Sequence, residues 1–379
     1  MAATFRIAAL KERAAGETRV ALTPETAKKF IALGASVVVE AGAGLAASIA
    51  DADYAAVGAE LAKAAAAAVK GADAVLGVQG PEAKALKGAN AGAWVIAGLD
   101  PFGQRGRVDE YAAAGLEALA MEFMPRITRA QSMDILSSQS NLAGYKAVIE
   151  AANLYGRAFP MMMTAAGTIS AAKAFVMGVG VAGLQAIATA RRLGAQVSAT
   201  DVRSATREQI ISLGAKPIFV ESVAGIEGEG AGGYATEMSE EYQKAQAELV
   251  SSHIAKQDIV ITTALIPGRA APRLISDAQI ASMKPGSVIF DLAVAQGGNV
   301  EGSVADQVVE RHGVKILGYS NTPAKLPADA SALFARNLYN FLSAFWDKEA
   351  GRPVLDAEIG DAIRLTQGGK VVNQRLLGA

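Results

Sequence analysis

The sequence predicts an α/β protein of two domains, each a mostly parallel sheet flanked by helices, with a cleft between them. Two observations predict this class. Short apolar segments alternate with segments of helical periodicity along most of the chain, a pattern typical of parallel strands joined by helices. The length of 379 residues is also more than a single hydrophobic core usually serves.

The first predicted domain opens the chain. Its strands are expected at residues 4–9, 36–40, 74–78, 94–99 and 117–121. Thr23 is predicted to cap a helix that has Pro24 at its first position and ends at Gly34. Further helices are expected at residues 55–70, which contain an alanine run, and at residues 111–114.

The second predicted domain is organised around a glycine motif in the middle of the chain. An apolar strand at residues 175–177 leads into Gly178, Gly180 and Gly183, and a helix is expected over residues 184–193. In this Gly-x-Gly-x-x-Gly spacing the first glycine permits a tight turn, the second lets a diphosphate approach, and the third allows close packing. The context predicts a Rossmann-like domain that binds a dinucleotide at the helix N-terminus; the alternative is a glycine-rich turn that binds nothing.

Asp201 follows the next predicted strand, at residues 196–200. A carboxylate at this place accepts hydrogen bonds from the adenosine ribose and repels a 2′-phosphate, which favours NAD(H) over NADP(H). Arg203 stands two residues further on, and a nearby arginine is how a 2′-phosphate would be held. The motif therefore predicts a nicotinamide dinucleotide, with NAD(H) as the preferred one.

The rest of the second domain supplies strands at residues 259–262, 288–292 and 315–317. The loop at 225–234 is glycine-rich and acidic, and the loop at 264–268 follows a strand end, where open α/β sheets bind ligands. A helix at residues 331–346 is predicted to return the chain to the first domain, and the tail after it carries little information. The expected boundaries are 1–138 with 325–379 for the first domain and 139–324 for the NAD(H)-binding domain.

Composition excludes several kinds of function. Lys and Arg number 36 and Asp and Glu 37, so no excess of positive charge indicates a nucleic-acid partner. The absence of cysteine and the presence of only two histidines exclude disulfides, thiolate zinc sites and multi-histidine metal sites. Residues 161–190 are apolar enough to suggest a membrane span, but a buried strand and helix around the glycine motif explain them better. We expect a cytoplasmic protein with no metal and no segment inserted in the membrane.

Several longer segments carry a resemblance to a known family. They are Lys11 and Glu12 with residues 17–24, the polar stretch at 124–145, residues 159–168, the glycine motif, and residues 262–268. Together they resemble the alanine dehydrogenase and nicotinamide nucleotide transhydrogenase superfamily, and the polar stretch looks specifically like the transhydrogenase branch. The resemblance extends to about Trp346 and is greatest to the NAD(H)-binding component of proton-translocating transhydrogenases.

The resemblance implies roles for four polar residues. Arg126 and Asp134 would lie beside the nicotinamide and hold its carboxamide and each other, Ser137 would hydrogen-bond the carboxamide, and Gln131 would reach toward the partner's nucleotide. Without the resemblance, the same segment would be taken as a solvated loop with a surface ion pair. Tyr234 resembles the tyrosine of the family's mobile loop, which closes over bound nucleotide. The candidate nucleotide-binding residues are Arg126, Ile127, Ser132, Asp134, Ser137, Gly178, Gly180, Val181, Ala182, Gly183, Asp201, Val202, Arg203, Gly233, Tyr234, Ala264 and Leu265.

The first domain departs from the alanine dehydrogenase pattern. Gln79 stands where those enzymes carry a substrate-binding lysine, and Leu99 and Asp100 stand in the segment that would carry the catalytic histidine. An oxo acid would therefore lack both a partner for its carboxylate and an acid for its carbonyl. Ala295 is a further departure, at a position where an acidic residue is expected.

The predicted function is direct hydride transfer from NADH on this chain to NADP⁺ on a partner. The resemblance implies a homodimer that associates with an NADP(H)-binding domain III and a membrane domain on other chains, and is attached peripherally to the inner membrane through them. Two alternatives remain at this point: an amino-acid dehydrogenase with displaced catalytic groups, and an NAD(H)-sensing module without turnover.

Overall fold

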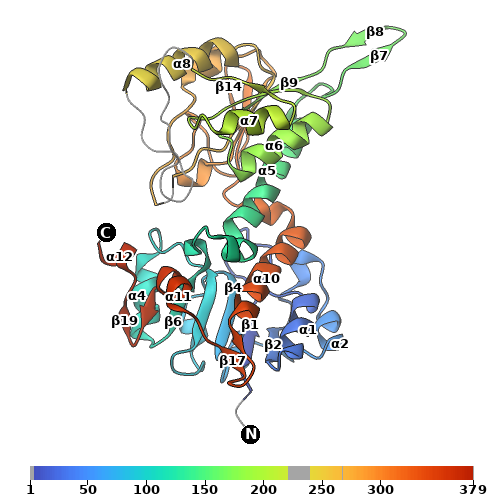
Figure 1. Cartoon of the computed structure of the whole chain (residues 1–379). Coiled ribbons are helices and arrows are strands. Elements are labelled where there is room, and N and C mark those ends of the chain that lie inside the picture. Colours follow the sequence, from blue (N-terminus) through green and yellow to red (C-terminus); the bar gives the residue numbers. More distant parts are fainter. Residues whose placement is uncertain (1–3, 221–239, 267, 379) are drawn as a thin grey trace. The chain divides into compact units, whose positions relative to one another are not determined.

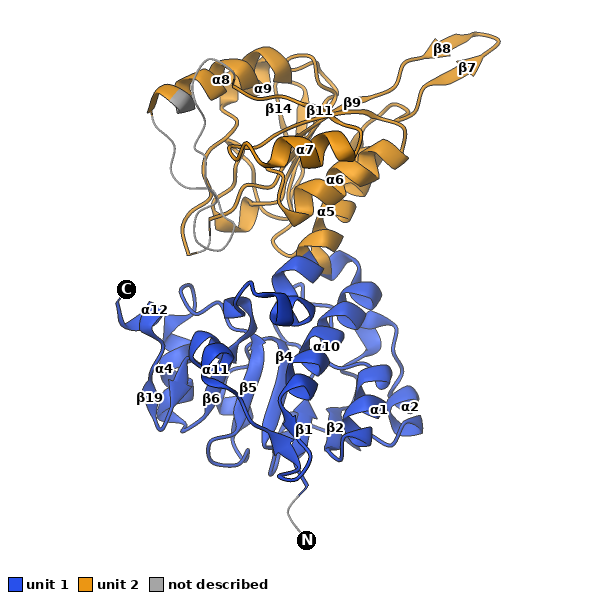
Figure 2. Cartoon of the chain, in the orientation of Figure 1, with its two compact units in different colours: residues 1–139, 324–379 blue, residues 140–323 orange. Residues whose placement is uncertain are grey.

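A computed structural model describes residues 4–220, 240–266 and 268–378. The chain forms two compact units: unit 1 comprises Met1–Gln139 and Ala324–Ala379, and unit 2 comprises Ser140–Pro323 (Figure 2). Unit 2 is therefore inserted in the sequence of unit 1. Among the described residues, no helix is both long enough and apolar enough to span a bilayer.

Unit 1 is built on a six-stranded sheet in the order β3-β2-β1-β4-β5-β6, with every pairing parallel. Its strands are β1 (Arg6–Ala9), β2 (Ser36–Glu40), β3 (Glu60–Ala62), β4 (Ala74–Gln79), β5 (Trp94–Gly98) and β6 (Glu117–Ala120). The helices joining them are α1 (Pro24–Ala32), α2 (Asp51–Ala56), α3 (Ala65–Val69) and α4 (Arg105–Ala113). The strand order reverses between β1 and β4, and the carboxyl ends of strands at such a point are where open sheets of this kind form ligand sites.

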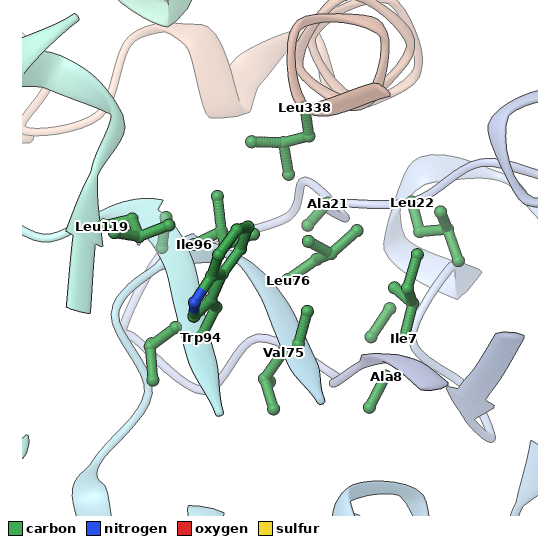
Figure 3. Close-up of a cluster of buried hydrophobic side chains, with 14 of the residues drawn as sticks. Ile7, Ala8, Ala21, Leu22, Val75, Leu76, Trp94, Ile96, Leu119 and Leu338 are labelled. Carbon is green, nitrogen blue, oxygen red and sulfur yellow. The ribbon is translucent and has the colours of Figure 1, made fainter. Parts of the chain in front are cut away.

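The returning helix α10 (Pro327–Ala344) closes the core of unit 1 (Figure 1). Leu338 on this helix is fully buried and points toward Leu76 and Ile96 on the central strands (Figure 3). The buried surface of the sheet is continuous and apolar, as parallel strands covered on both faces require. The return of the chain through this helix thus completes a core that the first 139 residues alone leave uncovered.

Two expectations for unit 1 need correction. Residues 55–70 do not form one helix: α2 ends near Gly58, whose φ is +92°, and β3 then pairs with β2 at the sheet edge before α3 begins. Alanine-rich composition favours a helix locally, but the edge of β2 offers unpaired backbone groups that residues 60–62 satisfy. The tail also has structure, with elements β16 (Trp346–Asp347), β17 (Arg352–Pro353), α11 (Ala357–Ile363), β18 (Thr366–Gln367), β19 (Lys370–Val371) and α12 (Gln374–Leu377).

Unit 2 is built on a seven-stranded sheet in the order β11-β10-β9-β12-β13-β15-β14. Its strands are β9 (Lys173–Met177), β10 (Gln196–Thr200), β11 (Lys216–Pro217), β12 (Ile259–Thr262), β13 (Val288–Asp291), β14 (Val309–Arg311) and β15 (Val314–Leu317). Only the edge strand β14 is antiparallel among these described pairings. The helices are α5 (Ile135–Leu154), α6 (Val181–Arg192), α7 (Thr206–Ser212), α8 (Glu240–Ile254) and α9 (Asp277–Ser282).

A hairpin extends from the body of unit 2 (Figure 1). Its strands β7 (Met162–Thr164) and β8 (Gly167–Ile169) pair antiparallel with each other. All of residues 161–170 are exposed, including Met163 with 80% of its surface accessible. The sequence prediction for this region was wrong in part: the apolar run begins with an exposed hairpin, and the buried strand starts only with β9.

Candidate functional site

The glycine-rich turn, residues 178–183, joins β9 to α6 in unit 2. Gly178 has a φ of +98°, a conformation that strongly favours glycine, and its N–H donates to Thr200 O at 2.9 Å. Gly183 packs directly on this turn, because a Cβ added there would lie 1.9 Å from Gly178 O. Thr263 Oγ1, after the neighbouring strand β12, donates to Gly178 O at 2.9 Å. The turn is therefore fixed by the helix behind it and the strand beside it.

Gly180 has a different environment. It is the N-cap residue of α6 and is exposed, and a Cβ added to it would meet no atom within 4 Å. No side chain of the described residues caps the helix, no acidic residue stands in its first turn, and Val181 is 37% exposed. Free N–H groups at an open helix N-terminus fit a diphosphate, so the turn can accommodate a dinucleotide.

Ala182 lies under a second close contact. A Cβ added to Gly144 of α5 would lie 2.0 Å from Ala182 O, so α5 packs backbone to backbone against the first turn of α6. No local pattern singles out Gly144, because its importance depends on a helix that is distant along the chain. This contact fixes the start of α6 relative to α5.

Asp201 lies at the carboxyl end of β10 and is 7% exposed. Its Oδ2 accepts from Val179 N at 2.7 Å, so the carboxylate also holds the glycine-rich turn. Arg203 binds it bidentately, with Nε 2.9 Å from Oδ1 and Nη2 2.9 Å from Oδ2, and Arg203 N donates to Oδ1 at 2.9 Å. Val202 between them is half-buried. Asp201 and Arg203, whose expected nucleotide preferences are opposite, are thus bound to each other.

The loop with Ala264 and Leu265 follows β12, next to the glycine-rich turn. Asn299, fully buried, accepts from Ala264 N at 3.1 Å and donates to Ala264 O at 2.9 Å. Asp291 at the end of β13 is also fully buried, and accepts from Asn299 N at 3.2 Å and Ser303 Oγ at 2.8 Å. The sequence analysis missed both side chains as supports of this loop. Leu265 itself is 40% exposed.

The polar segment, residues 126–137, lies in unit 1 and includes the short helix η4 (Thr128–Met133). Arg126, Gln131 and Ser132 are not buried, and Ile127 is partly exposed. Asp134 precedes α5 and caps it: its Oδ1 accepts from Ser137 N at 3.0 Å and its Oδ2 from Ser137 Oγ at 2.5 Å. The structure brings Asp134 and Ser137 together, and it leaves the Ser137 oxygen able to accept a further hydrogen bond.

The polar segment is held from behind by the C-terminal part of the chain. Asn337 of α10, 7% exposed, donates to Ser132 O at 2.8 Å and bonds Ser138 Oγ at 2.7 Å. Arg129 pairs with Asp356 at 2.6 Å and Glu358 at 2.5 Å, both at α11. These supports were not predicted, because they are at least 199 positions away along the chain. Gly233 and Tyr234 lie outside the described residues.

The carboxyl ends of the central strands of unit 1 carry a buried ionic cluster. Glu17 pairs bidentately with Arg19, with contacts of 2.8 and 2.7 Å, and accepts from Gln79 Nε2 at 2.8 Å. The side chain of Arg19 is 9% exposed and that of Glu17 fully buried. Burial opposes the charge of Glu17, but its hydrogen bonds to Arg19 and Gln79 keep its pKa below the ordinary value. Gln79 is therefore a neutral amide bound to an internal carboxylate.

Two more carboxyl groups end the adjacent strands β4 and β5. Glu12 accepts from Val78 N at 2.6 Å, and Glu122 accepts from Leu99 N at 2.7 Å. Burial raises the pKa of each to about 7, against the backbone hydrogen bonds that lower it. Their function in this unit is to satisfy backbone N–H groups at the strand ends.

Comparison with known proteins assigns the chain to a family. Residues 8–143 match the N-terminal domain, and residues 147–374 the C-terminal domain, of the family described as alanine dehydrogenase/PNT. An NAD(P) transhydrogenase alpha subunit of Rhodospirillum rubrum is 52% identical over 384 residues, 99% of both chains. A transhydrogenase structure from Sinorhizobium meliloti covers 97% of this chain and 100% of its own, with a TM-score of 0.88 and 54% identity.

Alanine dehydrogenases are more distant. The enzyme of Halomonas elongata is 28% identical over 91% of this chain and 88% of its own. The predicted resemblance and the predicted fold class, two Rossmann-like domains, are both confirmed by these matches. With both domain models matched over most of its length, the chain belongs to the alanine dehydrogenase/PNT family, and its similarity is greater to the transhydrogenases than to the alanine dehydrogenases.

Proposed function

We propose that the chain is the NAD(H)-binding component of a transhydrogenase and that NADP(H) binds on a partner. When bound, NADH supplies a hydride, a proton with two electrons, which converts it to NAD⁺ and NADP⁺ to NADPH. No oxygen or nitrogen atom gains a proton in that exchange, so the chain needs to supply placement and exclusion of water but no general acid. Its relatives named NAD(P) transhydrogenase support this function.

The observation that carries the proposal is the end of β4 in unit 1. Gln79 is held there by Glu17 and has no charge to offer a substrate carboxylate. Both histidines of the chain, His253 and His312, are in the sequence of unit 2. An amino-acid dehydrogenase needs a cation for the carboxylate and an acid for the carbonyl oxygen of its oxo acid. Hydride exchange between two nicotinamides needs neither.

In unit 2 we propose that Gly180, Val181, Ala182 and the open start of α6 bind the diphosphate, while Asp201 with Val202 and Arg203 surrounds the adenosine ribose. The fit rests on the space at Gly180 and on the uncapped N–H groups. Ala264 and Leu265 contribute one wall, which Asn299 supports. The loop with Gly233 and Tyr234 is assigned to closure over the nucleotide by family resemblance.

In unit 1 we propose that the polar segment recognises the nicotinamide. Ser137 donates its hydroxyl proton to Asp134, so its oxygen is oriented to accept from the carboxamide N–H₂. Arg126 offers donors for the carboxamide oxygen, and Ile127 and Ser132 contribute contacts. Gln131 is exposed on η4, which supports its assignment to the side that meets the partner's nucleotide.

We further propose that the chain works as a homodimer bound to an NADP(H)-binding domain and, through it, to a membrane domain. The hairpin β7–β8 supports dimerisation: it carries exposed Met161, Met162, Met163 and Ile169 and two strand edges without other described strands. Exposed apolar strands of this kind are usually covered by another chain. Attachment to the membrane through partners requires no membrane-inserted segment of this chain.

The test is a transfer assay. The chain is mixed with NADH and the thio-analogue of NADP⁺, with and without a purified NADP(H)-binding transhydrogenase domain, and reduction of the analogue is followed by absorbance. We expect fast reduction only when both proteins are present, and a loss of about 100-fold or more in Arg126→Ala or Asp134→Asn, the scale of a positioning defect.

The matched control is Arg192→Ala, an exposed arginine on the last turn of α6, which should transfer hydride at the unchanged rate. NADH binding and complex formation without any transfer would contradict the proposal and favour an NAD(H)-sensing module. Reduction of NAD⁺ by an amino acid, with no partner present, would favour the amino-acid dehydrogenase.

A further inference from the structure

The carboxylate of Asp201 has no free hydrogen-bonding direction toward a ribose. Oδ1 accepts from Arg203 N and Nε, and Oδ2 accepts from Val179 N and Arg203 Nη2, at distances of 2.7 to 2.9 Å. Two acceptor positions on each carboxylate oxygen are thereby used. The pair is largely buried, with 7% of the Asp201 side chain and 15% of the Arg203 side chain exposed.

Arg203 has the chemistry of a phosphate receptor. Its planar guanidinium binds carboxylate and phosphate in the same bidentate manner, and an arginine near this strand end is one of the ways in which dinucleotide-binding domains accept a 2′-phosphate. In this structure the guanidinium fork binds Asp201 instead. Asp201 therefore acts on selectivity twice: it presents a negative charge, and it neutralises the guanidinium beside it.

We propose that Arg203 is a latent 2′-phosphate receptor and that its bidentate pairing with Asp201 sets the preference for NAD(H). This inference rests on the proposed function, since it needs a nicotinamide dinucleotide at the glycine-rich turn. A ribose hydroxyl can replace one guanidinium contact on Asp201 at little cost. A 2′-phosphate would have to remove Arg203 from a charge-assisted pair while it approaches the carboxylate.

The substitution that separates these effects is Asp201→Asn. It keeps one oxygen that accepts from Val179 N, so the glycine-rich turn retains its support. The amide group replaces the oxygen that accepts from Arg203 and removes the negative charge, which releases the guanidinium. Arg203→Met removes the cation but keeps the length of an apolar side chain and leaves Asp201 charged.

The experiment measures the dissociation constants of NADH and NADPH by calorimetry for the full chain. The variants are Asp201→Asn, Arg203→Met and the double variant, with Arg192→Met as the matched control on α6. We expect Asp201→Asn to bind NADPH at least roughly tenfold more tightly than the wild type, since one charge-assisted contact is worth about a factor of ten or more. The double variant should lose that gain, and the control should bind both nucleotides as the wild type does.

Equal NADPH affinity in Asp201→Asn and the double variant would overturn the inference and leave the proposed function intact. If Asp201→Asn does not fold, as judged by circular dichroism, Arg203→Met decides alone. With a bare carboxylate facing the 2′-phosphate, its preference for NADH over NADPH must rise by roughly tenfold, and an unchanged preference overturns the inference. A wild-type chain that binds no NADH would overturn both the proposed function and the inference that rests on it.

Discussion

Two glycines three positions apart in the sequence have opposite surroundings. Gly180 faces open space, whereas Gly183 is pressed against the carbonyl oxygen of Gly178. The Gly-x-Gly-x-x-Gly spacing predicted both environments, because the turn geometry follows from local sequence. By contrast, Asn299 and the Asp201–Arg203 pair were not predictable as contacts. Their partners are fixed by tertiary packing or by rotamers that the sequence does not specify.

This contrast gives a residue-scale prediction. Gly183→Ala should lower the free energy of unfolding by about 1–3 kcal/mol, because its Cβ must displace the backbone of the turn. Gly180→Ala, with a φ of −80°, should leave the melting temperature unchanged and weaken NADH binding, because its methyl group occupies the space assigned to the diphosphate. Thermal melts and NADH titrations of the two variants check this. A destabilised Gly180→Ala chain would contradict the assignment.

At the scale of elements, prediction was reliable where one local rule governed the segment. The motif strand and helix, β9 and α6, and the returning helix α10 were all expected from apolar periodicity close to where they occur. The error at residues 55–70 arose because a strand of three residues forms only when the edge of β2 is already present. Elements of the tail were missed for the same reason, since Leu365 N bonds Ala118 O of β6 and provides no sequence signal.

The end of β5 carries a pH-dependent prediction. The pKa of Glu122 is raised to about 7 by burial, and its Oε2 is buried with no hydrogen-bond partner in the described part of the chain. Between about pH 4.5 and 7 the unfolded chain loses this proton while the folded chain keeps it, so the free energy of unfolding falls as pH rises, by up to about 3 kcal/mol. Glu122→Gln keeps the acceptor for Leu99 N and Asp100 N and should remove this dependence.

Melting temperatures of the wild type and Glu122→Gln, measured from about pH 4.5 to 8, check this expectation. The variant should become progressively more stable than the wild type as pH rises toward 7, and the difference should then level off. Parallel curves across the whole range would show that Glu122 titrates at its ordinary pKa.

For the whole molecule, the hairpin β7–β8 leads to a prediction about assembly. Met163→Asp places a charge on a side chain that is 80% exposed in the single chain, so it should not affect folding. If the hairpin is covered in a dimer, the same charge must be buried and should shift the protein toward monomers, as measured by light scattering after size-exclusion chromatography. Leu45→Asp, at 63% exposure in unit 1, is the matched control and should leave the mass unchanged. A dimer that persists in Met163→Asp would exclude the hairpin as its interface.

The insertion of unit 2 within unit 1 has a consequence for how the protein is made. During synthesis, residues 140–323 leave the ribosome as one continuous stretch and have all the described strands of their own sheet. Unit 1 has its six strands by then, but it lacks α10 and the contact between Leu365 and Ala118 until the last 56 residues, 324–379, emerge. The unit that begins first is therefore the unit that finishes last, and a ribosome that stops early releases a chain with unit 2 complete and the sheet of unit 1 open and apolar.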